Sequence, residues 1–234
     1  AVWEARDSSL ALYIPDIDPA TMKISSDQII RLTENGMPSM YYGTNAFPRS
    51  IPLNKGQFDD DPEDEFVLGY MADEGDGEGG PVFVAIYDMD RNSGVLLLKD
   101  TLSSVMLKPG LYNANNGLSR GSLFDISTGD FNQDGMDELV VAAVTPYPDG
   151  DEFGWRLDAY IYEMISGELV FSVQTEEPLF SEPENSSDYL RRLAVVAGNF
   201  DNDFFPDIAV SYQVVETGAG DSDIYLRALK ASLE

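Results

Sequence analysis

The sequence contains no cysteine and no histidine. Without cysteine the chain can form no disulfide and has no thiol nucleophile. Without histidine it lacks the usual general base of enzymes and the commonest protein ligand of transition metals. Ser-His-Asp and Cys-His catalytic sets are therefore excluded, and an active site in this chain would have to use carboxylates, tyrosines or arginines.

Basic residues and long apolar runs are also scarce. The chain has 14 basic residues against 42 acidic ones, which gives a formal net charge of -28. Nucleic acids and anionic membranes both attract basic surfaces, so we predict no nucleic-acid partner and no membrane insertion. No apolar run approaches the roughly 18 residues of a membrane-spanning helix. The acidity fits either cation sites and solubility or adaptation to high salt.

What the sequence does contain is an acidic stretch at residues 129–141. Oxygen-bearing side chains alternate there, and Gly135 allows the tight turn that would bring them together. Hard cations such as Ca²⁺ take about 6–8 oxygen ligands of this kind. An EF-hand would need a glutamate at the twelfth position, where Val141 stands instead. The predicted Ca²⁺ ligands are the side chains of Asp130, Asn132, Asp134 and Glu138 and the backbone carbonyl of Met136.

The acidic stretch is one of three copies. Their glycines, Gly56, Gly129 and Gly198, lie roughly 70 residues apart. A phenylalanine follows each glycine by two residues and a carboxylate follows it by nine; these are Phe58, Phe131 and Phe200, and Glu65, Glu138 and Asp207. An apolar run comes directly after each carboxylate, and alternating apolar residues precede each glycine. Each copy therefore predicts a strand, an acidic loop and a second strand.

The remainder of each copy predicts further strands. Aromatic and β-branched residues fill 81–87, 155–162 and 223–229. The first two runs lead through turns at 92–94 and 166–167 into strands at 95–97 and 169–171. Near the N-terminus, 10–14 and 21–25 are typical of strands, whereas 26–33 fits a short helix or a strand. A full copy thus holds about four strands, and the fold class is all-β.

Repeats of four antiparallel strands are typical of β-propellers, which usually have about 4–8 blades. We predict one region over 1–234, with a partial blade at about 1–50 and repeats starting near 51, 122 and 191. About three blades plus a partial one would form a fragment or an incomplete ring. A β-sandwich with acidic turns is the alternative.

The three loops resemble the FG-GAP/VCBS repeats of integrin-α-like β-propellers, whose pattern is Gly-Asp-Phe-Asn/Asp-x-Asp-Gly-x-x-Asp before an apolar strand. The second loop follows this pattern nearly throughout, with Glu138 as its last carboxylate. The third loop has Asn199 at the first ligand position and Phe204 in place of the glycine. The first loop has Gln57 and Pro62 at those two positions. The resemblance covers roughly residues 45–234.

The resemblance implies Ca²⁺ ligands in the other two loops. In the third loop they are Asn199, Asp201, Asp203, Asp207 and the Phe205 carbonyl. In the first loop they are Asp59, Asp61 and Glu65, with Gln57 and the Glu63 carbonyl as further candidates. The alternative for every loop is an acidic turn whose Asp side chains cap its own amides.

The resemblance also implies a function. It is a non-catalytic, calcium-binding module, extracellular or on the cell surface, for adhesion or recognition of a glycan or protein ligand, within a larger polypeptide or assembly. A sequon at Asn185 is in keeping with that location. Aromatic and amide residues at 40–45 and 112–116, with Trp3 and Trp155, suit such a surface. The alternatives are a purely structural module and a polysaccharide lyase or hydrolase, for which the generic candidates are Tyr41, Tyr42, Arg49 and Arg120.

Overall fold

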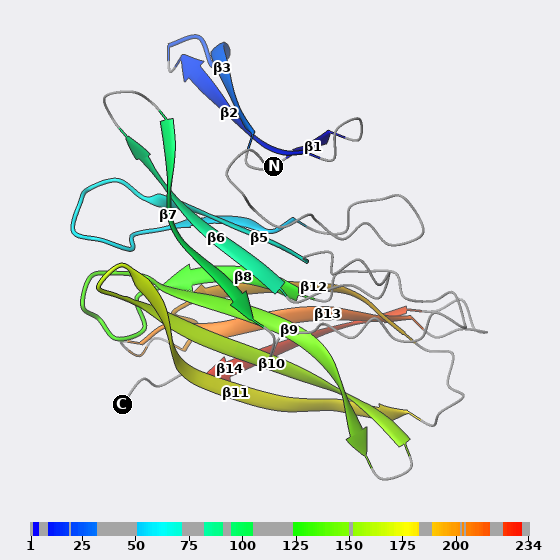
Figure 1. The fold of residues 1–234 in the computed structure, drawn as a ribbon. Helices are drawn as coiled ribbons and strands as arrows, with labels where there is room; N and C mark the ends of the chain where they lie inside the picture. The colour runs from blue at the N-terminus through cyan, green and yellow to red at the C-terminus, as the bar shows by residue number, and fades with distance from the viewer. Residues whose placement is uncertain are drawn as a thin grey trace.

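The computed structural model describes most of the strands and all three acidic loops. The described residues are 2–4, 9–18, 20–31, 51–71, 82–90, 95–104, 124–149, 152–182, 189–201, 203, 205–215 and 222–230. Within these ranges every regular element is a β-strand and every pairing is antiparallel (Figure 1). No helix long and apolar enough to cross a membrane occurs in them. The predicted all-β class is confirmed.

The described strands form four sheets in which neighbours in sequence are neighbours in space. The first sheet consists of β1 (Val2–Glu4), β2 (Ser9–Asp18) and β3 (Lys23–Arg31). The second consists of β4 (Leu53–Gly56), β5 (Glu65–Met71), β6 (Val82–Asp90) and β7 (Val95–Ser104). The third consists of β8 (Phe124–Gly129), β9 (Glu138–Asp149), β10 (Glu152–Ile165) and β11 (Glu168–Glu182). The fourth consists of β12 (Tyr189–Gly198), β13 (Asp207–Val215) and β14 (Ser222–Lys230).

Two of these sheets confirm the predicted four-strand unit, the β4–β7 sheet and the β8–β11 sheet. The segment 26–33, for which a helix and a strand were both considered, contributes to β3 up to Arg31. The strand expected at 21–25 begins only at Lys23, because residues 20–22 form the turn before it. The expected turn at 166–167 is present, with positive φ angles of 55° and 85° that suit a two-residue hairpin.

The four-stranded sheets share a register irregularity as well as a strand order. In the β6–β7 ladder the pairing skips Lys99, beside Tyr87. In the β10–β11 ladder it skips Ser172, beside Tyr162. In both sheets the bulge stands at the same place and re-aims the side chain of the skipped residue. The two units are therefore built alike.

The core lies between the sheets. Strand β9 contributes to the core from both of its faces. Its continuous apolar run is buried on both sides, as expected for a strand that is covered on two sides. Leu139, Val141 and Ala143 pack toward the β4–β7 sheet, together with Phe58 and Ile86. Val140, Ala142 and Val144 pack toward the β12–β14 sheet in a second cluster that contains Phe131, Leu193, Val195, Ile208 and Val210.

Side-by-side inner strands tie these sheets together, with β8 lying between β4 and β12. The Thr128 hydroxyl donates a 2.6 Å hydrogen bond to the Lys55 carbonyl, which links β8 to β4. The Val195 N–H donates at 2.9 Å to Asp125, which links β12 to β8. Within the described ranges the sheets form an open stack and do not close into a ring (Figure 1).

Candidate metal centres

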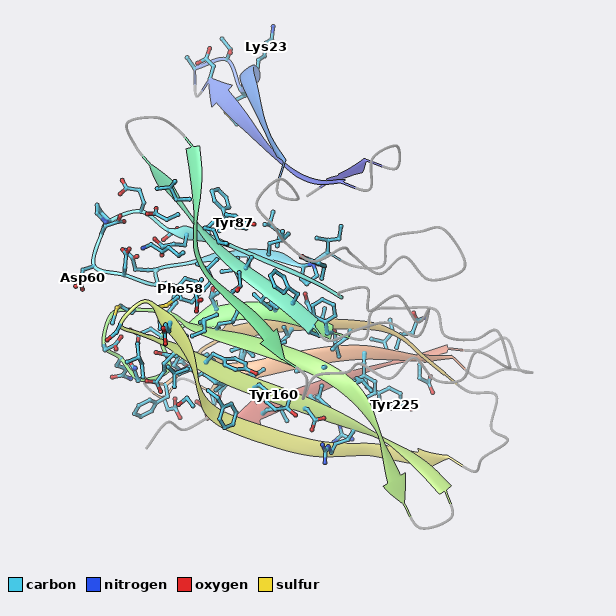
Figure 2. The ribbon with its side chains drawn as sticks, in the orientation of Figure 1. Lys23, Phe58, Asp60, Tyr87, Tyr160 and Tyr225 are labelled. Carbon is cyan, nitrogen blue, oxygen red and sulfur yellow. The ribbon has the colours of Figure 1, made fainter. Side chains whose placement is uncertain are left out.

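The three acidic loops connect the first two strands of three successive sheets. The first loop (residues 56–65) joins β4 to β5, the second loop (129–138) joins β8 to β9, and the third loop (198–207) joins β12 to β13. Phe58 and Asp60 mark the first loop in Figure 2. Residues 202 and 204 of the third loop lie outside the described part of the chain. The predicted strand–loop–strand order is therefore confirmed for all three copies.

The carboxylate that ends each loop is buried and closes the loop on itself. Glu65 and Glu138 are 0% and 2% exposed, and each accepts a hydrogen bond from the N–H of the loop phenylalanine. These bonds run from Phe58 at 2.7 Å and from Phe131 at 2.6 Å. Asp207, 6% exposed, does the same for Phe200 at 3.2 Å. One oxygen of each of these predicted ligands is thus engaged by the backbone.

Short turns capped by acidic or amide side chains shape each loop. In the second loop, Asn132 accepts from the Asp134 N–H at 2.9 Å, and Asp134 accepts from the Met136 N–H at 2.8 Å. The first loop repeats this pattern at Asp59 and Asp61, and the third loop repeats it at Asp201 and Asp203. The predicted ligand side chains therefore fix the turns they stand in, as the acidic-turn alternative also requires.

The second loop also has the backbone conformation that its glycine predicted. Gly135 has a φ of 92° and Gln133 a φ of 62°, both in the left-handed region. The Asp130 carboxylate accepts from the N–H groups of Asp134 and Gly135, both at 3.1 Å. One side chain at the start of the loop thus gathers the amides of its far side, and the loop coils around that carboxylate.

The first ligand position behaves differently in the other two loops. The Gln57 side-chain amide donates to the Asp61 carbonyl, and the Asn199 amide donates to the Asp203 carbonyl. An amide presents a donor where the second loop presents two carboxylate oxygens. The second loop is therefore the copy best equipped for a cation at this position.

Burial and crowding of like charge mark the second and first loops as electrostatically strained. Burial raises the pKa of Glu138 to about 7, and the nearby Asp134 and Asp130 carboxylates add to this, against the N–H groups of Phe131 and Asn132 that lower it. Burial likewise raises the pKa of Glu65, with Asp88 and Asp61 adding to it. A cation in either loop would relieve this repulsion.

The first loop gains a carboxylate that the sequence prediction missed. One carboxylate oxygen each from Asp59, Asp61 and Asp88 lies within 4.8 Å of the others, and this group could hold a metal ion. Asp88 comes from β6, where the residue before it, Tyr87, pairs with Phe66 of β5. Only the strand register brings it to the loop, since it lies far outside the repeated motif. Glu65, the other predicted carboxylate ligand, is not a member of this group.

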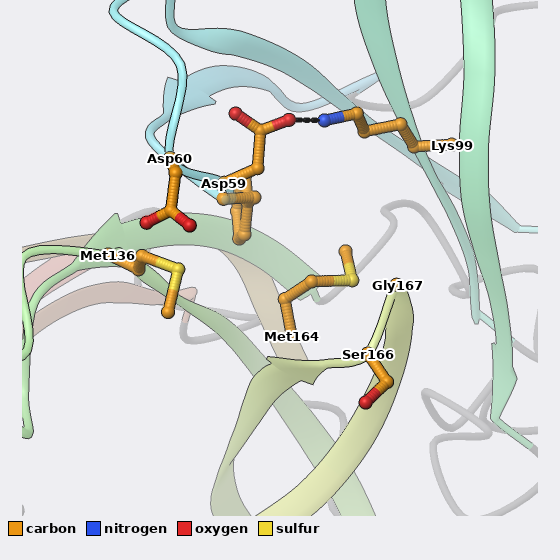
Figure 3. A pocket seen from close by; sticks show the side chains of 8 residues that line it. Asp59, Asp60, Lys99, Met136, Met164, Ser166 and Gly167 are labelled. Atoms are coloured by element: carbon orange, nitrogen blue, oxygen red, sulfur yellow. Dashed lines mark ion pairs between the residues drawn. The ribbon is translucent and has the colours of Figure 1, made fainter.

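A lysine lies among these carboxylates. The Lys99 ammonium is paired with Asp59, and its Nζ is 3.8 Å from Glu65 Oε1 and 4.0 Å from Asp88 Oδ2. Figure 3 shows Lys99 reaching from β7 to Asp59. A cavity of about 290 Å³ opens beside the pair, lined also by Phe58, Asp60, Met136, Met164, Ser166 and Gly167.

Asp137 is a further residue that the loop pattern did not single out. Its carboxylate accepts from the Gln57 N–H at 2.9 Å, and its own N–H donates to the Gln57 carbonyl at 2.5 Å. The second loop is thus bonded directly to the first ligand position of the first loop. The sequence shows Asp137 as a carboxylate next to Glu138. Its partner Gln57 could not be predicted, because it depends on how the sheets pack.

The two predicted carbonyl ligands of the second and third loops also take part in the capped turns. Met136 donates its N–H to Asp134, while Phe205 donates its N–H to Asp203. The catalytic and sugar-binding candidates at 40–45, Arg49, 112–116 and Arg120, and the sequon at Asn185, lie outside the described residues. Trp3 and Trp155 lie in β1 and β10, and only the backbone of these two residues is described. The ligand assignments in all three loops stay predictions.

Comparison with known proteins leaves the loops as the main guide to function. The likeness of the three loops to FG-GAP/VCBS repeats stays a prediction drawn from their residues. The site itself is described by its own geometry: three self-closing acidic loops, one of them with a lysine among its carboxylates. No protein-family model matches this chain, and no curated protein sequence is significantly similar to it.

Proposed function

We propose that this chain is a non-catalytic, calcium-stabilised β-sheet module of the propeller type that presents a recognition surface for a glycan or a protein outside the cell. The observation that carries the proposal is the shared construction of the three loops. Each ends in a buried carboxylate bonded to the loop phenylalanine, and each precedes that carboxylate with capped acidic turns. An enzyme active site is rarely built in three copies within one chain. Structural cation sites, in contrast, often recur in each copy of a repeat.

Calcium is the cation that suits this donor set. The second loop offers carboxylate and amide oxygens from Asp130, Asn132, Asp134 and Glu138, together with the Met136 carbonyl. All of these are hard oxygen donors, and the chain has no histidine or cysteine to favour zinc or copper. Bound between two strands, Ca²⁺ would offset both the burial and the like-charge repulsion that raise the pKa of Glu138.

The propeller arrangement is supported by the repeated packing of the loop phenylalanine. Phe58 and Phe131 are 1% and 0% exposed, because each packs against the next sheet along the chain. Phe200 holds the same position in the third loop but is 53% exposed, and Val196 and Phe205 nearby are also exposed. A further sheet of the same kind packed on the β12–β14 sheet would cover them, as blades cover one another in a propeller.

The recognition part of the proposal is tested by binding assays with the calcium-loaded protein. A glycan array and a pull-down from extracellular matrix extract should give a specific ligand without turnover. Release of oligosaccharide products from a polyanionic polysaccharide would overturn the non-catalytic assignment and favour a lyase or hydrolase. Stable association with a protein partner, without glycan binding, would narrow the function to assembly.

A further inference from the structure

The first loop has a lysine ammonium among its own carboxylates. Lys99 is 26% exposed in its side chain, and its ammonium is paired with Asp59 and lies near Glu65 and Asp88. Asp59 and Glu65 hold the third and ninth positions after the loop start, which are ligand positions in the calcium prediction. The ammonium therefore lies against the oxygens that a metal in this loop would need.

A buried oxygen points into the same place. Glu65 is fully buried, and its Oε2 accepts from the Phe58 N–H. Its Oε1 has no hydrogen-bond partner among the described residues. The closest charge to Oε1 among the described ion pairs is the Lys99 ammonium at 3.8 Å. Leaving a buried carboxylate oxygen in this state is costly unless a cation lies close by or the carboxyl takes up a proton.

We propose that Lys99 is the resident cation of the first loop, and that its ammonium takes the place of the divalent ion there. This inference rests on the proposed calcium binding of the loops. A tethered ammonium offsets part of the negative charge of Asp59, Glu65 and Asp88 without a binding step, so it competes with any metal from within the chain. The first loop consequently takes up no Ca²⁺ while Lys99 is present.

The comparison with the β8–β11 sheet supports this substitution. The bulge that frees Lys99 from the β6–β7 ladder is matched in the β10–β11 ladder by Ser172. There the Ser172 hydroxyl donates at 2.5 Å to Glu163, which stands one residue after Tyr162 as Asp88 stands one residue after Tyr87. At the bulge equivalent to that of Lys99, the β8–β11 sheet thus has a neutral hydroxyl where the β4–β7 sheet has an ammonium. The second loop also keeps Asp130 and Gly135, which Gln57 and Pro62 replace in the first loop.

The test is the number of Ca²⁺ ions bound per chain, measured by isothermal titration calorimetry and equilibrium dialysis on the full chain. Lys99→Met keeps most of the side-chain volume and removes the charge, so this variant should bind one more Ca²⁺ than the parent. Adding Asp88→Asn to that variant should weaken the gained site at least tenfold. Ser172→Lys, the reciprocal change, should cost the second loop its ion.

The outcomes separate this inference from the proposed function. If the parent binds Ca²⁺ and Lys99→Met gains no site, the resident-cation inference is wrong while calcium binding stands. If the parent binds none and Lys99→Met gains one, the inference stands and the proposed function fails. Near-ultraviolet circular dichroism of each variant in Ca²⁺ checks folding. If Lys99→Met unfolds, Lys99→Gln must still gain the site, and its failure to do so would overturn the inference.

Discussion

At the scale of single residues, the acidic side chains of the loops have two roles. Asp130, Asn132 and Asp134 shape the second loop by accepting its backbone amides. Glu138 closes that loop from the first residue of β9 while buried, and its pKa is raised for that reason. The loop therefore folds around its carboxylates and leaves them mutually repelling, which is the state a cation stabilises.

The left-handed conformation of Gly135 gives the first prediction. Gly135→Ala should lower the free energy of unfolding by about 1–2 kcal/mol, because a Cβ is disfavoured at a φ of 92°. Nothing lies within 4 Å of the added atom, so the cost is conformational and not steric. Gly135→Asn is the matched control, since asparagine tolerates this region and should cost less. Urea unfolding of both variants measures the difference, and equal losses would contradict a purely conformational origin.

The raised pKa of Glu138 gives a prediction about pH. In the metal-free folded state the pKa is about 7 against a usual 4.5, so between these values the folded chain holds a proton that the unfolded chain has released. The contribution of Glu138 to stability therefore falls as pH rises through this window. Glu138→Gln cannot ionise, so in EDTA its stability relative to the parent should improve by roughly 1–3 kcal/mol between pH 4.5 and 7.5.

Calcium should reverse the order of stability of the parent and the Glu138→Gln variant at pH 7.5. With excess Ca²⁺ at pH 7.5, the parent should become the more stable of the two, because the metal uses the Glu138 charge that glutamine lacks. Chemical denaturation at several pH values, with and without Ca²⁺, provides both comparisons. A difference between the two proteins that does not change with pH in EDTA would show that the Glu138 carboxyl is not strained.

At the scale of elements, the exposure of the loop phenylalanine shows whether the next sheet covers its own sheet. Phe131 is buried between the β8–β11 and β12–β14 sheets, whereas Phe200 stands at the same motif position and is 53% exposed. The glycines that begin the loops show the same difference between covered and uncovered sheets. A Cβ on Gly56 would meet Thr128 of the next sheet at 3.0 Å, whereas the three atoms nearest to a Cβ on Gly198 all belong to Phe200 of its own loop.

This contrast gives a paired prediction. Phe131→Ala should cost about 3–5 kcal/mol of stability, because it opens a cavity between two sheets. Phe200→Ala should cost less than about 1 kcal/mol, as an exposed position does. Denaturant unfolding of the isolated chain measures both. A large loss at Phe200 would mean that this face is already covered in solution.

The sequence predicted the elements better than it predicted the contacts between them. Apolar alternation and the Gly–Phe–carboxylate register were enough to find the strands and the three loops, because both signals are local. Asp88 and Lys99 were missed as partners of the first loop, because a strand register and a bulge bring them there. Asp137 was missed as a link between loops because its partner, Gln57, belongs to another sheet.

At the scale of the whole molecule, the three sheets that carry acidic loops are linked in series through their inner strands. The Asn54 side chain donates at 3.4 Å to the Ile126 carbonyl, and the Ala197 N–H donates at 2.9 Å to Ser127. The Leu169 N–H donates at 2.6 Å to Asp100, so the outer strands of neighbouring sheets are also joined. The first and second loops thus lie where two sheets meet, and a cation that stiffens either of these loops should stabilise the packing of both sheets.

The decisive measurement is therefore thermal unfolding with saturating Ca²⁺ and after complete removal of metal by EDTA. At a free Ca²⁺ concentration about 100-fold above the dissociation constant, one occupied loop adds about 2.7 kcal/mol, or roughly 5–10 °C in Tm for a chain of this size. Asp130→Asn should reduce this shift by weakening the second loop. A Tm that is the same with Ca²⁺ and in verified metal-free buffer would contradict calcium stabilisation and leave the loops as self-capped acidic turns.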